Sequence, residues 1–243
     1  MKITHVAHTA PDPKRSTRTR GVRRLALAVA AFLPVAGLAT FAGTSVLQQG
    51  AGASPVNLVT DGDFGNTTAA PGSYLTVFAG DSTTIPGWTV VTPALYGPTG
   101  GSVDVVSSSY VNWGAQGGSK DSIDLGGTSS EAGGIYQDVP TTPGVEYSLS
   151  YWTAVNGDQA SGVSHTMSVV VGGTPMPNIV ALSAGAPLQW VQQTNLITAT
   201  SSSTRIEFDD DTPGDTNQGP ALDNVSMTAI PDVITAAAAT VSP

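Results

Sequence analysis

The sequence contains no cysteine, few charged residues and, beyond residue 53, almost no basic side chains. The absence of cysteine excludes disulfides, thiolate zinc sites, iron–sulfur clusters and thiol nucleophiles. Charged residues make up 11 % of the 243 residues, whereas hydrophobic residues make up 40 %. This composition provides enough apolar surface for a packed core, so we expect a globular protein that is stable without covalent cross-links.

The basic residues are concentrated at the N-terminus. Seven of the nine Lys and Arg residues lie within the first 24 positions, and Lys120 and Arg205 are the other two. Beyond residue 53 the chain therefore carries seventeen acidic and two basic side chains, which gives a net charge of −15. A surface this acidic repels phosphate backbones and anionic lipids, so we expect neither nucleic acid nor a membrane surface as a partner.

Residues 1–53 have the layout of a secretory signal peptide. A basic stretch ends at Arg24, an apolar run continues to about Val46, and residues 51–53 are small, as a cleavage site requires. The run is also long enough for a retained membrane span, although proline, glycine and hydroxyl residues dilute it. We predict cleavage and a secreted, extracellular protein; the pair Arg23-Arg24 also permits twin-arginine export.

The rest of the chain is predicted to form short strands. No window of twelve or more residues has apolar groups at helical spacing, whereas period-two alternation recurs between turn-forming clusters. The predicted strands are Ile85–Val91, Ser102–Val106, Ser122–Leu125, Ile135–Val139, Val145–Thr153, His165–Val171, Trp190–Thr198, Arg205–Asp209 and Leu222–Thr228. This pattern is typical of an all-β, antiparallel β-sandwich or barrel. We predict one domain over residues 55–229 and a flexible tail over 230–243.

Three stretches of the chain, taken in order, resemble a known family. They are Asn57–Phe64 followed by Ile85–Val90, then Gly101–Val106 with Ser122–Gly127, and finally Gly219–Val225. Together they resemble the bacterial choice-of-anchor C family, which is related to plant cell-wall proteins of the domain of unknown function 642 group. The resemblance implies a galactose-binding-like jelly roll with a role directed at wall polysaccharide and without enzymatic activity. Bacterial members usually end in a surface anchor, which this tail does not show.

The resemblance also implies a structural calcium ion. In similar jelly-roll carbohydrate-binding modules, an ion joins the N-terminal loop to the last strand. Asp223 matches the aspartate of that strand, whereas Gly65 stands where the loop usually has glutamate. Asp61 and Asp63 provide nearby carboxylates of the kind that calcium prefers. We therefore predict a calcium ion held by Asp61, Asp63 and Asp223, the alternative being loss of the site, and we expect no organic cofactor.

Two features of the sequence bear on catalysis. His165 is the single histidine beyond residue 53, and no Gly-x-Ser-x-Gly motif accompanies it, so a serine triad is not expected. Asp104 and Asp124 lie in strand-like motifs that would let them face each other, as the paired carboxylates of a glycosidase must. The other interpretation is hydrogen bonding at the rim of a sheet, because no local sequence places either acid in an apolar pocket.

Tyr110 and Trp113 are the predicted sugar-binding residues. Sugar rings pack their C–H faces on aromatic side chains. Trp88 and Trp190 begin strands and are expected in the core. Segment 107–119, in contrast, is rich in glycine and serine, which disfavours burial of its aromatic side chains. Core packing of Trp113 is the alternative. We predict a secreted, non-catalytic β-sandwich that binds a glycan or cell-wall polysaccharide. A structural or adhesion protein without a sugar site and a polysaccharide-cleaving enzyme are the alternatives.

Overall fold

The computed structural model describes most of the chain beyond the predicted signal peptide. The described residues are 55–67, 69–97, 100–128, 132–156, 164–176, 180–183, 188–214 and 217–231. The predicted signal peptide and most of the predicted tail lie outside them. Within these ranges no helix is long and apolar enough to span a membrane.

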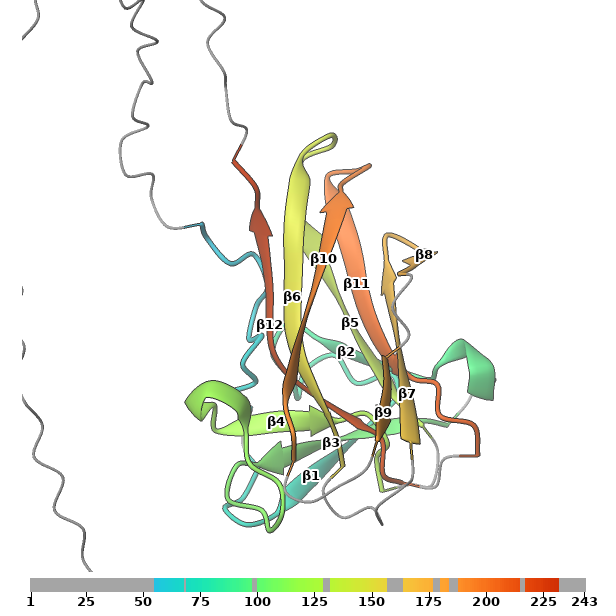
Figure 1. Cartoon of the computed structure of the whole chain (residues 1–243). Coiled ribbons are helices and arrows are strands. Elements are labelled where there is room, and N and C mark those ends of the chain that lie inside the picture. The colour runs from blue at the N-terminus through green and yellow to red at the C-terminus, as the bar shows by residue number, and fades with distance from the viewer. Residues whose placement is uncertain are drawn as a thin grey trace, which may run out of the picture. The chain divides into compact units, whose positions relative to one another are not determined.

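The described chain forms two antiparallel sheets (Figure 1). Their strands are β1 (Tyr74–Phe78), β2 (Thr89–Val91), β3 (Ser102–Ser107), β4 (Asp121–Asp124), β5 (Gly134–Pro140), β6 (Glu146–Val155), β7 (Ser164–Val171), β8 (Thr174–Pro175), β9 (Val180–Ser183), β10 (Val191–Thr198), β11 (Ser203–Asp210) and β12 (Pro220–Ala229). Sheet A has the order β1-β3-β4-β12-β6-β10, and sheet B has the order β2-β5-β11-β7-β8, with β9 paired to β7. Two short 3-10 helices, η1 (Ala94–Tyr96) and η2 (Gln116–Gly118), lie in loops. The prediction of an all-β antiparallel fold is confirmed.

Each of the nine predicted strands overlaps a strand of the structure, but Ile85–Val91 is extended only over β2. Sequence alternation does not identify β8, β9 or β1. Strand β1 lies at the edge of sheet A and exposes apolar side chains on both of its faces: Leu75 is 39 % exposed and Phe78 is 60 % exposed. An edge strand of this kind lacks the alternation on which strand prediction depends.

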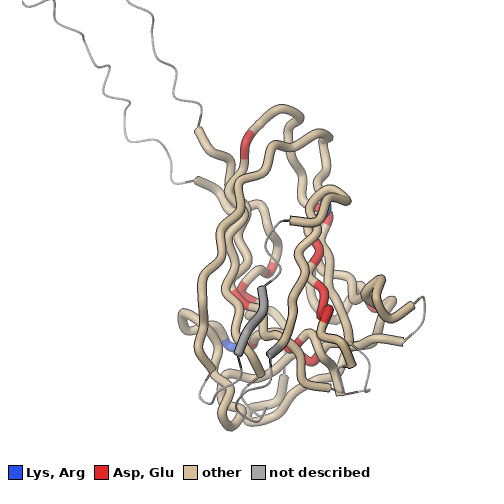
Figure 2. Tube along the Cα trace, turned by 45° about the vertical axis from the view of Figure 1, so that its right-hand side comes forward, with Lys and Arg blue, Asp and Glu red and all other residues tan. Residues whose placement is uncertain are grey.

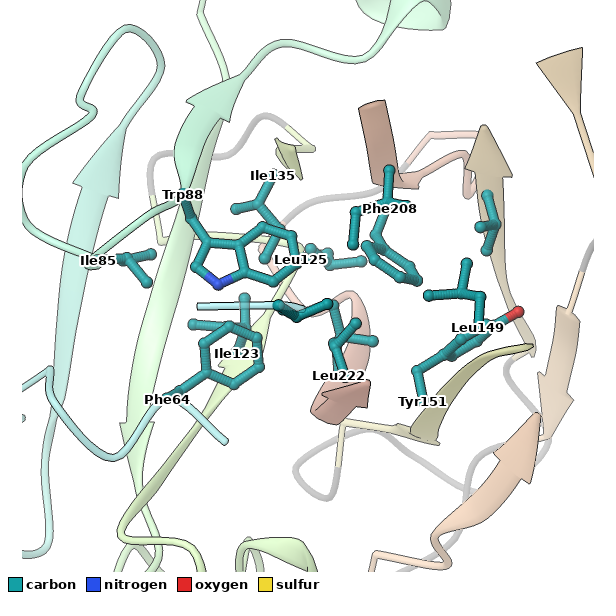
Figure 3. Packing of buried hydrophobic residues seen from close by; sticks show 14 of the residues in the cluster. Phe64, Ile85, Trp88, Ile123, Leu125, Ile135, Leu149, Tyr151, Phe208 and Leu222 are labelled. Atoms are coloured by element: carbon teal, nitrogen blue, oxygen red, sulfur yellow. The ribbon is translucent and has the colours of Figure 1, made fainter. Parts of the chain in front are cut away.

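The core lies between the inward faces of the two sheets (Figure 3). Tyr151 on β6 meets Phe208 on β11 edge to face, with ring centroids 5.0 Å apart. Trp88, which is 1 % exposed, lies 6.2 Å from the Phe208 ring and 5.7 Å from the Phe64 ring. The prediction that Trp88 belongs to the core is therefore confirmed. Burying each such side chain contributes about 1.5–3 kcal/mol of hydrophobic stabilisation.

The N-terminal loop is fixed to the last strand by a close backbone approach. The Val225 amide donates to the Gly62 carbonyl at 2.8 Å. A Cβ atom at Gly62 would lie 2.0 Å from the Val225 carbonyl oxygen, so position 62 has no room for a side chain. Glycine is therefore required here by contact rather than by backbone conformation.

Candidate functional site

Two aspartates face each other on the outer surface of sheet A. In the ladder between β3 and β4, Asp104 is the direct partner of Asp124. Alternate strand residues point to opposite faces, so their neighbours Val103, Val105 and Ile123 enter the core while both aspartates point away from it. The pairing that the sequence motifs suggested is present in the structure. Both aspartates are nevertheless buried, with exposures of 5 % and 3 %, because loops cover this face.

Trp113 lies in the loop that covers the outer face. Its side chain is 6 % exposed, and its indole nitrogen donates to the Ser122 hydroxyl at 2.6 Å. Its buried partners are Val106, Ala154, Leu188 and Ala221. The expectation of an exposed Trp113 ring is wrong, because Ala154 and Ala221, on strands distant in the sequence, provide an apolar floor for this glycine- and serine-rich loop. Tyr110 is partly buried and packs against the same cluster.

The loop is fastened to sheet A by residues of β12. The Gln116 amide donates to Asp223 Oδ2 at 2.8 Å, and Asn224 Nδ2 donates to the Gln116 carbonyl at 2.7 Å. Asn224 adopts a left-handed conformation, φ = 48°, at an irregularity in the pairing of β12 with β6. The indole of Trp190 adds a bond to the Gly114 carbonyl at 3.0 Å. These bonds hold Tyr110 and Trp113 over the sheet.

The three predicted calcium ligands are not gathered into one site. Asp61 Oδ1 accepts bonds from the backbone and side-chain nitrogens of Asn66, at 3.0 and 2.9 Å. Asp63 is exposed and accepts a hydrogen bond from the Gly65 amide at 3.3 Å. Burial raises the pKa of Asp223 to about 7. Among the described residues, no three His, Cys, Asp or Glu side chains form a group able to hold a metal ion. Asp61 and Asp223 accept hydrogen bonds that fold their loops, and the three carboxylates do not form one ligand group.

Beside Trp113 lies a small hollow of about 120 Å³, which we call the aromatic hollow. Its lining residues are Tyr74, Asp104, Val106, Tyr110, Trp113, Asp124, Thr128, Asn156, Asn217 and Gln218. The rings of Tyr74 and Tyr110 meet edge to face with centroids 5.8 Å apart, and Tyr74 is 41 % exposed. The structure thus brings Tyr110 and Trp113 to one site; their role in binding stays a prediction.

Asp124 has a structural role in this hollow. Its Oδ1 accepts from the amides of Gly126 and Gly219, at 3.0 and 2.8 Å, and its Oδ2 accepts from Asn156 Nδ2. Burial raises the pKa of Asp124 well above its usual range, and the neighbouring Asp104 adds to the rise. The carboxyl group of Asp124 therefore joins three segments of the chain rather than facing a ligand.

Asp104 has unused hydrogen-bonding capacity. Its Oδ2 accepts from the Thr128 hydroxyl at 2.5 Å, whereas its buried Oδ1 accepts no hydrogen bond within the described part of the chain. Buried polar atoms are normally paired, so this oxygen can still accept a hydrogen bond. The pair does not offer two free carboxyl groups, as glycoside hydrolysis requires.

Sequence reasoning missed Tyr74 and Asn156. Tyr74 begins β1, which alternation did not identify, and Asn156 directly follows β6. No local pattern marks either residue, because the hollow is built from five separate segments.

Comparison with known families gives one family match. The model described as "Protein of unknown function (DUF642)" matches residues 57–228. The predicted relation to the domain of unknown function 642 group is confirmed. The choice-of-anchor C assignment stays a prediction. Among characterised proteins, the chain is similar to Halomucin of Haloquadratum walsbyi (strain DSM 16790 / HBSQ001), with 34 % identity over 221 residues. The match covers 89 % of this chain but spans 2 % of the length of Halomucin.

Several solved structures are similar to parts of the sandwich. A family 16 carbohydrate-binding module has 19 % identity and a TM-score of 0.37, covering 52 % of this chain and 84 % of the module. The CBM22-1 xylan-binding domain of Paenibacillus barcinonensis Xyn10C has 17 % identity and a TM-score of 0.41, covering 67 % and 97 %. The arabinose-bound MgGH51 α-L-arabinofuranosidase has 14 % identity and a TM-score of 0.46, covering 71 % and 26 %.

Proposed function

Because the chain belongs to the DUF642 family, whose description assigns no activity, we propose that it binds carbohydrate through the aromatic hollow. The observation that carries this proposal is the meeting of three aromatic side chains with a buried, unpaired carboxylate oxygen at one hollow. Aromatic rings pack on the C–H faces of sugars, and a polar acceptor beside them orients hydroxyl groups.

The site is built on rigid elements. Tyr74 and Asp104 belong to neighbouring strands of sheet A, and Tyr110 is held by the loop that Asp223 fastens. A rigid site has little side-chain freedom to lose when a ligand binds, which favours affinity from a small contact area. The amide side chains of Asn217 and Gln218 add polar groups to the lining.

A glycan array probed with the purified full-length chain is the first test, followed by calorimetry with the glycans that bind. Tyr74→Ala should weaken binding by about tenfold, since loss of an aromatic contact of about 1.4 kcal/mol corresponds to that factor. Phe78→Ala is the matched control, because Phe78 is 60 % exposed on the same strand and does not line the hollow. An array without binding, or equal effects of the two substitutions, would refute the proposal.

A second candidate function is adhesion through protein contacts. The two edge strands of sheet A expose large apolar side chains: Leu75 and Phe78 on β1, and Val191 and Leu196 on β10. Exposed edges with apolar side chains favour pairing with another chain. Sedimentation analysis across a concentration series would reveal self-association; loss of that association in Leu196→Lys would assign it to β10.

We further propose that binding takes place outside the cell and without catalysis. The signal-peptide layout of residues 1–53 supports export, and the structural role of Asp124 argues against a hydrolytic acid pair. Mass determination of the protein recovered from culture medium would test export and locate the cleavage site.

A further inference from the structure

We propose that the aromatic hollow selects sugars with a free, protonated amine, such as glucosamine or galactosamine units of a polysaccharide. The inference rests on the proposed carbohydrate site and names the chemical class of its ligand. It follows from the charge of the hollow, which is a property separate from its aromatic lining.

Within the described part of the chain, no cationic side chain lines the hollow beside its carboxyl groups. Asp104 and Asp124 stand directly opposite each other on neighbouring strands, where like charges repel. None of the lining residues is Lys, Arg or His. Asp124 is satisfied by amide donors, but Asp104 receives one hydroxyl bond and retains a buried oxygen without a partner. A cationic hydrogen-bond donor entering the hollow would pair with this oxygen and would offset the repulsion between the two carboxyl groups.

The two basic residues beyond position 53 lie elsewhere. Arg205 forms a two-pronged ion pair with Asp138 on sheet B, at 2.8 and 2.9 Å. Lys120 lines a different hollow together with Asp121. Acidic residues otherwise predominate over the described chain (Figure 2). The hollow is therefore an anionic site on an anionic protein, and the field of the whole molecule attracts cations and repels uronic acids.

The lining and size of the hollow favour an organic ammonium group. The faces of Tyr and Trp rings attract cations, most strongly where water is excluded. The rings of Tyr74 and Tyr110 lie on the same hollow as Asp104, so one amine can contact a ring and a carboxylate together. A volume of about 120 Å³ suits a single substituent of a sugar ring better than a whole sugar.

Ligands that differ only at the nitrogen provide the decisive comparison. Calorimetry with wild-type full-length chain would use trimers of glucosamine and galactosamine, their N-acetylated forms, and the corresponding neutral trimers, at about pH 6, where a primary amine is protonated. EDTA would be present to remove metal ions. An amine trimer should bind about tenfold to a hundredfold more tightly than its N-acetylated form, as expected for a charge-assisted hydrogen bond.

Substitution of Asp104 tests the site. Asp104→Asn should lower affinity for the amine trimer to the level of the N-acetylated trimer and leave the latter unchanged. Asp138→Asn is the matched control, because it removes the same charge from sheet B and should change neither affinity. If Asp104→Asn does not fold, the ligand comparison with the wild-type protein still decides the matter.

The outcomes separate this inference from the proposed function. Equal binding of amine and N-acetylated trimers, or amine binding unchanged in Asp104→Asn, would overturn amine selection and leave carbohydrate binding intact. Tighter binding of a uronic acid polymer would also overturn it. If no glycan on the array or among the trimers binds, both proposals fail together.

Discussion

Trp113→Ala should destabilise the fold strongly, although Trp113 lies in a glycine-rich loop. The side chain is 6 % exposed and packs over four buried residues of sheet A and its covering segments. Truncating a buried aromatic side chain costs about 3–5 kcal/mol of unfolding free energy. A surface loop relaxes more readily than a strand, which places the packing loss near the lower end, at about 3 kcal/mol.

The lost hydrogen bond adds to the packing loss. Trp113 Nε1 donates to the Ser122 hydroxyl, which is fully buried, so truncation leaves that hydroxyl without this donor. Removing one partner of a buried bond costs about 1 kcal/mol or more. We therefore expect a total loss of about 4 kcal/mol for Trp113→Ala. Trp113→Phe keeps most of the ring contact and should lose about 1–2 kcal/mol.

Urea unfolding followed by far-UV circular dichroism measures both values. For a domain of this size, a loss of 4 kcal/mol also lowers the melting temperature by roughly 8–16 °C. Phe78→Ala serves as the reference for an exposed ring and should cost less than about 1 kcal/mol. A loss below about 1 kcal/mol for Trp113→Ala would refute the buried position of the indole and the loop arrangement with it.

Three further predictions concern the loops and the buried acids. Gly62→Ala should lower the free energy of unfolding in urea by at least about 3 kcal/mol, because its Cβ would meet the Val225 carbonyl. Gly65→Ala, whose Cβ would make ordinary 3.5 Å contacts, should change it by less than about 1 kcal/mol. Similar losses for both would contradict the close approach at Gly62. Burial, with a smaller effect of nearby acids, raises the pKa of Asp209 to about 8, so the native state holds a proton that the unfolded state releases above about pH 4. Stability should therefore fall as pH rises through this window, and Asp209→Asn should lose less stability between about pH 5 and pH 8; identical pH profiles would disprove the shift. Melting in millimolar calcium and in excess EDTA should give the same temperature, since Asp61, Asp63 and Asp223 do not form a ligand group; stabilisation by calcium would restore the predicted ion.

The strands and the core could be predicted because their signals are local. In β6, Tyr147, Leu149 and Tyr151 alternate with partly exposed residues, and all three are buried as the alternation indicates. Its place at the start of a strand put Trp88 in the core, whereas Trp190, expected there on the same ground, is partly buried and packs against the cluster around Trp113. An alternating segment buries one face whatever its partner strand is, so these features need no knowledge of the topology.

The site depended on contacts between distant segments, which no local pattern encodes. Asp124 bonds with Asn156 and with the Gly219 amide, at sequence separations of 32 and 95 residues. Trp113 is buried because strands from other parts of the chain supply its floor, and Asp223 fastens a loop that begins more than a hundred positions earlier.

The sequence by itself determined the residue chemistry, the all-β class and the acidic charge. The register and order of the strands decided which acids meet, which ring is buried and where a hollow remains, because those are properties of pairings between segments.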